Sequence, residues 1–103
     1  MRRLSLTAAS LLQAIVDGAV YGFDIIDRTG LPSGTVYPAL SRLERDGLVR
    51  STWEREDDAH AEGRPARRYY QLTAPGVRAL ADTTSQYRAL LPTLGNRPAR
   101  GRA

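Results

Sequence analysis

The sequence predicts a mainly α-helical domain that carries a single two-stranded β-hairpin. Three observations predict this class. Four segments repeat apolar residues at the spacing of one helix face, two short segments rich in β-branched and aromatic residues flank a polar stretch, and glycines or prolines separate the segments. The length of 103 residues fits one small domain.

The first two helices are predicted from apolar spacing. Residues 5–18 place Leu11 and Ile15 on one apolar face, which is typical of an amphipathic helix. Residues 21–29 are expected to form a short second helix with Phe23 facing inward. A glycine-containing turn then leads into the next helix, as a helix-turn-helix requires.

Residues 33–46 are predicted to form the third helix. Val36, Leu40 and Leu43 lie four and three residues apart, so they form one buried stripe. The side of the helix that faces away from this stripe is small and polar, with no acid at its centre. That side and its flanks consist of Gly34, Thr35, Tyr37, Pro38, Ser41, Arg42 and Arg45.

A β-hairpin is predicted to follow the third helix. Residues 48–54 and 67–73 have the β-branched and aromatic composition of two paired strands. The segment between them, residues 55–66, is polar, charged and interrupted by a glycine and a proline. We therefore expect a long, mobile hairpin tip without secondary structure of its own.

The last helix is expected to begin after Thr73, whose hydroxyl can cap it, and to end at Pro92. Its apolar residues alternate three and four apart, which indicates a helix-packing seam. The seam consists of Val77, Leu80, Thr84, Tyr87 and Leu91. Residues 92–103 are rich in Pro, Gly and Arg and are expected to be disordered.

Three helices, a hairpin and a further helix, in this order, form a winged helix-turn-helix. The third helix of that fold enters the major groove of double-stranded DNA, and the hairpin, or wing, contacts flanking phosphates or the minor groove. The expected DNA contacts are Ser33, Gly34, Thr35, Tyr37, Pro38, Ser41, Arg42, Arg64 and Arg67. We favour Arg64 as the contact from the wing tip. Ion pairs of the wing arginines with Glu54 or Glu56 are the alternative.

Composition excludes several other classes of protein. Fifteen arginines and 11 acids give a net charge of +4, and three of the arginines lie in residues 92–103, so the rest is nearly neutral. The chain has no Cys and a single His, so we expect no enzyme, no metal site and no cofactor. It shows neither a secretory signal nor an apolar run long enough to span a bilayer, so we expect a cytoplasmic protein with no membrane partner.

Three motifs resemble the PadR family of bacterial transcriptional regulators. They are YGFDIIDR, SGTVYPALSRLERDGLVRSTWE and RRYYQLTAPGVRAL, which occur in that order. The resemblance covers about residues 9–81. Because a single helix follows the wing, the chain looks like the short type of the family.

The resemblance implies a homodimeric repressor that binds a palindromic operator and is often released by a small effector. It also implies that the last helix packs with the first helix across the dimer interface, in agreement with the apolar seam. The expected interface residues are Leu11, Ile15, Val77, Leu80, Thr84, Tyr87 and Leu91. Trp53, with Tyr87 opposite, is a candidate wall of a pocket for a small hydrophobic or aromatic effector at that interface. Packing of Trp53 at the base of the hairpin is the alternative.

We therefore expect a DNA-binding domain over residues 1–73, a dimerisation helix over 74–91 and a disordered tail over 92–103. A winged-helix module that docks a protein without binding DNA is the alternative function. The nearly neutral body and the acidic wing tip favour that alternative.

Overall fold

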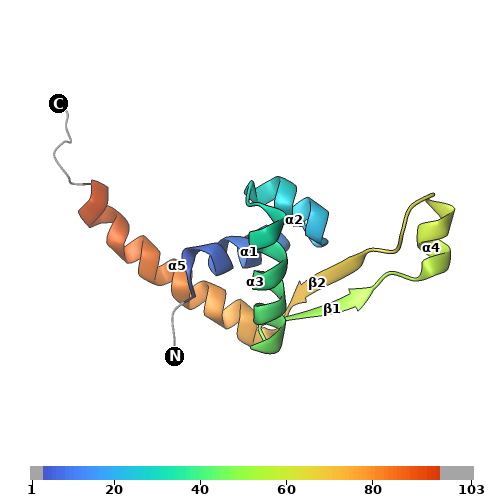
Figure 1. Cartoon of the computed structure of the whole chain (residues 1–103). Coiled ribbons are helices and arrows are strands. Elements are labelled where there is room, and N and C mark those ends of the chain that lie inside the picture. Colours follow the sequence, from blue (N-terminus) through green and yellow to red (C-terminus); the bar gives the residue numbers. More distant parts are fainter. Residues whose placement is uncertain (1–3, 96–103) are drawn as a thin grey trace.

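The computed structural model describes residues 4–95 and confirms a mainly helical fold with one hairpin. Its elements are α1 (Leu6–Val16), α2 (Gly22–Thr29), α3 (Ser33–Arg45), β1 (Val49–Trp53), α4 (Glu56–Ala61), β2 (Arg68–Leu72) and α5 (Ala74–Gly95). Figure 1 shows α1, α2 and α3 grouped at the centre. The hairpin projects to one side of α3, and the far end of α5 projects to the opposite side.

Side-chain caps and one glycine set the helix boundaries. The Ser5 hydroxyl accepts a hydrogen bond from the backbone N–H of Ala8 (3.0 Å) and caps α1. The Thr73 hydroxyl accepts one from the N–H of Gly76 (3.1 Å), which confirms the predicted start of α5. Gly30 ends α2 in the left-handed conformation, at φ 73°, which favours glycine.

One hydrophobic core joins α1, α2, α3, α5 and the two strands of the hairpin. The predicted stripe of α3 is confirmed, because Val36, Leu40 and Leu43 are all buried. The hairpin adds Val49 and Tyr70 to the same cluster. The other large side chains of the core are Leu11, Leu12, Ile15, Ile25 and Leu80.

The hairpin strands pair antiparallel, with Val49 opposite Leu72, and confirm the two predicted strands to within one residue at each end. An isolated bridge between Tyr21 and Tyr69 joins the second strand to the segment that precedes α2. The base of the wing is therefore tied to the helical body on both sides, by its strands and by this bridge.

The tip of the wing contains a helix that was not expected from the sequence. Helix α4 occupies half of the segment that was expected to be a mobile loop, so that expectation is wrong. Its first turn holds three acids, and negative charge stabilises a helix N-terminus. Ala59 is buried under the tip with 1% exposure, which gives this helix a packed side.

Two further expectations are corrected. Phe23 is 74% exposed and does not face the core, because Gly22 and Ile25 form the buried side of α2. Helix α5 continues through Pro92 to Gly95, so the proline does not end it. The rest of the predicted disordered tail lies outside the described residues.

Candidate nucleic-acid interface

The outer side of α3 is exposed along the length of the helix. Its inner side is anchored in the core, which turns the opposite residues toward solvent. Every residue of α3 that was predicted to contact DNA is exposed, and none is acidic: Ser33, Gly34, Thr35, Tyr37, Pro38, Ser41 and Arg42. Most of these side chains are short, so another molecule can approach the helix backbone closely.

Tyr37 rests on the start of α2. A Cβ on Gly22 would collide with the Tyr37 ring and hydroxyl, so the missing side chain of Gly22 makes room for the ring. Tyr37 stays 45% exposed at the edge of the α3 surface. Arg42, by contrast, takes part in none of the ion pairs within residues 4–95, so its guanidinium is available to a partner.

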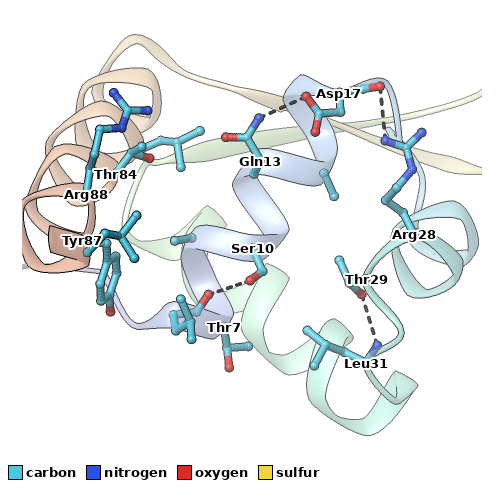
Figure 2. Close-up of a pocket in the computed structure, with 15 residues that line it drawn as sticks. Thr7, Ser10, Gln13, Asp17, Arg28, Thr29, Leu31, Thr84, Tyr87 and Arg88 are labelled. Atoms are coloured by element: carbon cyan, nitrogen blue, oxygen red, sulfur yellow. Dashed lines mark hydrogen bonds between the residues drawn. The ribbon is translucent and has the colours of Figure 1, made fainter. Parts of the chain in front are cut away.

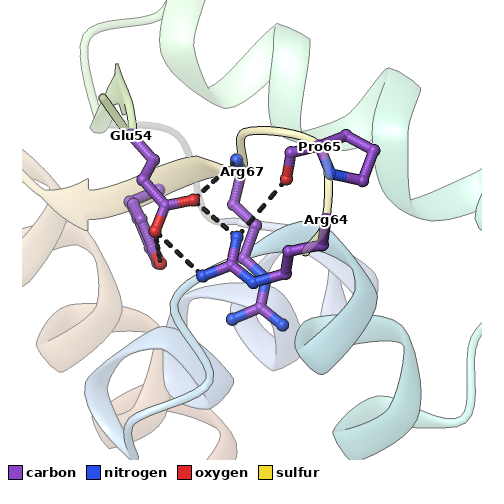
Figure 3. A network of polar contacts seen from close by, with 5 residues as sticks. Glu54, Arg64, Pro65 and Arg67 are labelled. Carbon is purple, nitrogen blue, oxygen red and sulfur yellow. Dashed lines mark hydrogen bonds and ion pairs between the residues drawn. The ribbon is translucent and has the colours of Figure 1, made fainter. Parts of the chain in front are cut away.

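An ion pair braces the wing between its two sides (Figure 3). Arg64 donates two hydrogen bonds to Glu54, from Nη1 to Oε1 at 2.5 Å and from Nη2 to Oε2 at 2.9 Å. The same carboxylate accepts the backbone N–H of Arg67 at 3.2 Å and the hydroxyl of Tyr69 at 3.4 Å. We call these four residues the Glu54 clamp.

The clamp changes the acidity of its charged members. The hydrogen bond from Arg64 holds the pKa of Glu54 at about 2, well below the ordinary 4.5, although burial acts in the opposite direction. The same hydrogen bond raises the pKa of Arg64. The Arg64 side chain is 23% exposed, so this pairing leaves little of it free for the DNA contact expected at the wing tip. The alternative ion pair with Glu54 is formed.

Two further arginines connect the wing to the helices. The Arg67 guanidinium lies over the Tyr21 ring, 4.0 Å from its centroid, at the junction with α2. Arg68 donates to Glu44 of α3 from Nη2 (3.1 Å) and to Ser51 of β1 from Nε (2.9 Å). Ser51 also donates to Glu44 (2.8 Å). These contacts set the position of the wing beside the exposed side of α3.

A hollow of about 660 Å³ lies between α1, the end of α2 and α5 (Figure 2). Leu6 and Leu91 contribute apolar surface to its wall. Gln13 donates to the Asp17 carboxylate at 3.0 Å, and Arg28 reaches the Asp17 carbonyl at 3.5 Å. The wall of this hollow therefore combines apolar and polar side chains from α1 and α5.

The predicted dimer residues fall into two groups. Three of them are buried inside their own chain, which corrects their assignment to an interface: Leu11, Ile15 and Leu80. Their exposures are 0%, 6% and 8%, so they stabilise the subunit itself. The others keep accessible surface on α5: Val77, Thr84, Tyr87 and Leu91.

Trp53 and Tyr87 line different hollows of the chain. Tyr87 faces the hollow between α1 and α5, whereas Trp53 lines a second one between the wing, α3 and the start of α2. The two rings are therefore not brought together within one chain.

Among residues 4–95, no group of acidic or histidine side chains could hold a metal ion, and no helix has the length and hydropathy to cross a membrane.

Two features of the structure were not predicted from the sequence: the exposure of Phe23 and the network centred on Glu54. Gly22, Ile25 and Thr29 share the spacing of one helix side, which indicates that Phe23 lies outside it. The four contacts of Glu54 had no comparable signal, because they depend on how the hairpin tip folds back on β1.

Three packed helices, an exposed third helix and a wing held beside it define a winged-helix protein. The chain belongs to the PadR-like family of transcriptional regulators, whose family model matches residues 11–82. This match confirms the family that the motifs resemble. No curated protein matches the sequence significantly.

Solved structures share the fold. A PadR family transcription regulator from Clostridium difficile R20291 has a TM-score of 0.76 and 23% identity, over 90% of this chain and 97% of that one. The protein smu.1704 from Streptococcus mutans UA159 has a TM-score of 0.71 and 26% identity, over 99% and 97%. The PcaV transcriptional regulator from Streptomyces coelicolor, in complex with its natural ligand, has a TM-score of 0.78 and 19% identity, over 95% of this chain and 65% of that one.

Proposed function

We propose that this protein is a homodimeric repressor that binds a palindromic DNA operator by sequence. The observation that carries the proposal is the exposed, acid-free side of α3 beside a braced wing. An α-helix with this kind of surface fits the major groove, and a wing beside it reaches the neighbouring phosphates. Membership in a family of transcriptional regulators supports the same function.

The residues of α3 divide into two roles in this proposal. Arg42, Thr35 and Ser41 read base edges, with Arg42 as the bidentate partner of a guanine. Ser33 and Tyr37 bond phosphate oxygens, and the small Gly34 lets the backbone approach. From the wing, Arg67 replaces Arg64 as the phosphate contact, because Arg64 is held by Glu54.

The surface of α5 supports a homodimer. Val77 and Leu91 lie on the same side of α5 and are 54% and 59% exposed, and Leu6 of α1, which shares a hollow with Leu91, is 66% exposed. Large apolar side chains that gather on one face mark an association surface. We propose that α5 pairs two subunits, so that two copies of α3 meet two halves of a palindrome.

The bound dimer would repress by covering the promoter, and a small effector would release it. PcaV, which shares the fold, was solved in complex with its natural ligand, which supports an effector here.

A fluorescence-anisotropy titration tests DNA binding by sequence. The protein is titrated onto the DNA upstream of its own gene and onto a scrambled duplex, at two salt concentrations. We expect tighter binding to the upstream DNA at both, because base contacts persist when salt screens the phosphates. Equal binding to both duplexes that disappears at the higher salt would contradict the proposal.

Arg42→Ala should weaken binding to the upstream DNA about tenfold or more, because a bidentate base contact contributes roughly 1–3 kcal/mol. Arg78→Ala, which removes an exposed arginine from α5, is the matched control and should keep the affinity.

A protein-docking module is the second candidate. The three exposed acids of α4 at the wing tip favour it, since they would repel phosphate and attract a basic protein surface. Under this alternative, Arg42→Ala and Tyr37→Phe leave the DNA affinity unchanged.

A further inference from the structure

Helix α3 carries one acidic residue, Glu44, and its carboxylate is turned toward the wing. All other polar side chains of α3 are neutral or cationic. A carboxylate on a helix that approaches DNA repels the phosphates, and the Glu44 side chain is still 33% exposed. The partners of this carboxylate therefore affect how α3 and the wing meet DNA.

Glu44 and two residues of the wing form a closed set of hydrogen bonds. Arg68 of β2 donates from Nη2 to Oε1 of Glu44 at 3.1 Å, and from Nε to the hydroxyl of Ser51 on β1 at 2.9 Å. The Ser51 hydroxyl donates its single proton to Oε2 of Glu44 at 2.8 Å. Each residue contacts the other two, so the set joins α3 to both strands of the wing. We call these three residues the Glu44 triangle.

The triangle also withholds the charge of Arg68. This side chain is 42% exposed, but its guanidinium is paired with Glu44 and lies 5.7 Å from the centroid of the Trp53 ring. A guanidinium that already has a carboxylate partner attracts a phosphate less strongly than an unpaired one. The neighbouring Arg67 differs, because it makes none of the ion pairs within residues 4–95. Of these two adjacent arginines, only Arg67 can offer an unpaired charge to DNA.

We propose that Glu44 determines the sequence specificity of DNA binding, by fixing the wing to α3 and by withholding Arg68 from phosphates. A wing that is fixed to α3 meets the DNA backbone only when α3 is seated in the groove. An unpaired Arg68, by contrast, would attract the phosphates of any sequence equally. Glu44 acts through Arg68 and does not itself contact DNA, so it is a positioning residue. This role rests on the proposed function.

Titration of Glu44→Gln with the upstream and the scrambled duplex tests this role. The released Arg68 should steepen the salt dependence of binding to the scrambled duplex by about 0.9 in log–log slope, as one further phosphate contact does. The preference for the upstream DNA should fall about threefold or more, because the scrambled duplex gains a contact while the upstream DNA loses a fixed wing. A preference equal to that of the wild type would overturn the proposal, whether both affinities rise or fall.

Two variants separate the position of the charge from its amount. Asp46→Asn removes the same charge at the end of α3, but Asp46 is exposed and takes part in none of the ion pairs within residues 4–95. It should change both affinities by the same factor and keep the preference. Glu44→Asp retains a carboxylate for Arg68 and should restore the wild-type salt dependence. If Asp46→Asn lowered the preference as much as Glu44→Gln, net charge would explain the effect and the proposal would fail.

NMR spectroscopy on the full chain tests the triangle without DNA. A hydrogen-bonded arginine Nε–H exchanges slowly with water, so the Arg68 signal should be protected in the wild type and in Asp46→Asn, and unprotected in Glu44→Gln. Exchange of Arg68 as fast as that of the exposed Arg50 would overturn the triangle.

The two readouts distinguish the possible failures. If the wild type bound neither duplex, the proposed function would fail and the role of Glu44 with it, even where NMR finds the triangle. If the wild type prefers the upstream DNA and Glu44→Gln keeps that preference, only the role of Glu44 fails.

Discussion

At the scale of the residue, one close backbone contact determines how α5 crosses the hairpin. Gly76 is buried, and a Cβ at this position would overlap the carbonyl oxygen of Leu48. Thr73 strengthens the same crossing, because its hydroxyl donates to the Gly47 carbonyl at 2.6 Å. The start of α5 therefore requires a residue without a side chain where it passes β1.

Gly76→Ala should lower the free energy of unfolding by about 1–3 kcal/mol, because either the backbone of Leu48 or that of α5 must move. Gly34→Ala is the control. A Cβ at Gly34 meets nothing within 4 Å, and alanine has the higher helix propensity in this first turn of α3, so stability should stay the same or rise by up to about 1 kcal/mol. Urea unfolding measures both, and equal effects of the two changes would contradict the close contact.

The Glu54 clamp predicts a pH dependence of stability. A carboxyl whose pKa is lower in the folded state stabilises the fold above its unfolded pKa. This stabilisation is present above pH 4.5 and is lost as the pH falls toward about 2. Glu54→Gln should therefore be less stable than the wild type at neutral pH and lose less stability on acidification through this window.

Urea unfolding across a pH series measures the difference. Glu62→Gln, which changes an exposed acid beyond the end of α4, should keep the wild-type slope. A wild-type slope in Glu54→Gln would show that the carboxylate is not held by the clamp in solution.

At the scale of the element, apolar periodicity predicted each helix that contributes a stripe to the core. The stripe Val36, Leu40 and Leu43 predicted α3, and the expected bounds of 33–46 agree with the structure to within one residue. Helix α4 has no such stripe, because Ala59 is its only buried residue. It forms because acids stabilise its N-terminus and because the hairpin tip folds back on β1. Apolar periodicity detects neither of these causes.

The exposed side of α3 could be predicted because it is the side opposite the buried stripe. The partners of the wing arginines could not be predicted from the sequence. Whether Arg64 points outward or onto Glu54 depends on the turn at Gly63, which adopts a φ of 72° after α4. Composition alone left both outcomes open. Pro92 was expected to end α5 but does not, because a proline near the end of an established helix removes only one hydrogen-bond donor.

The packing of α4 predicts how the wing tip responds to substitution. Ala59→Glu places a charge at a position with 1% exposure and should open the tip, since burying an unsatisfied polar group costs roughly 1–3 kcal/mol. Ala61→Glu makes the same change at an exposed position of the same helix and should leave the tip closed. Trypsin cleavage after Arg55 should be about tenfold faster in Ala59→Glu than in Ala61→Glu. Equal rates would mean that α4 is not packed in solution.

At the scale of the whole molecule, the elongated shape separates the proposed DNA surface from the proposed dimer surface. The chain measures 58 × 31 × 21 Å, with the wing and the end of α5 projecting in opposite directions (Figure 1). The proposed DNA surface and the proposed dimer surface therefore do not compete for the same residues. A substitution in the DNA surface can therefore be tested without directly altering the dimer surface, and the reverse also holds.

Leu91→Asp should convert dimers to monomers, because it places a charge in the proposed apolar interface without touching the core of the subunit. Ala89→Asp adds the same charge at another exposed position of α5 and should leave the dimer intact. Sedimentation velocity measures the oligomeric state, and circular dichroism checks that both variants remain folded. A dimer that survives Leu91→Asp would place the interface elsewhere.

The location of Trp53 has a practical consequence. It is the only tryptophan of the chain, and its ring is 63% exposed in the gap between the wing and α3, with the Arg68 guanidinium 5.7 Å from its centroid. Indole emission shifts to shorter wavelength when water leaves the ring. Closure of the wing around any partner would therefore shift the emission maximum of the intrinsic fluorescence to shorter wavelength. The position of the wing can be followed in this way without an added label.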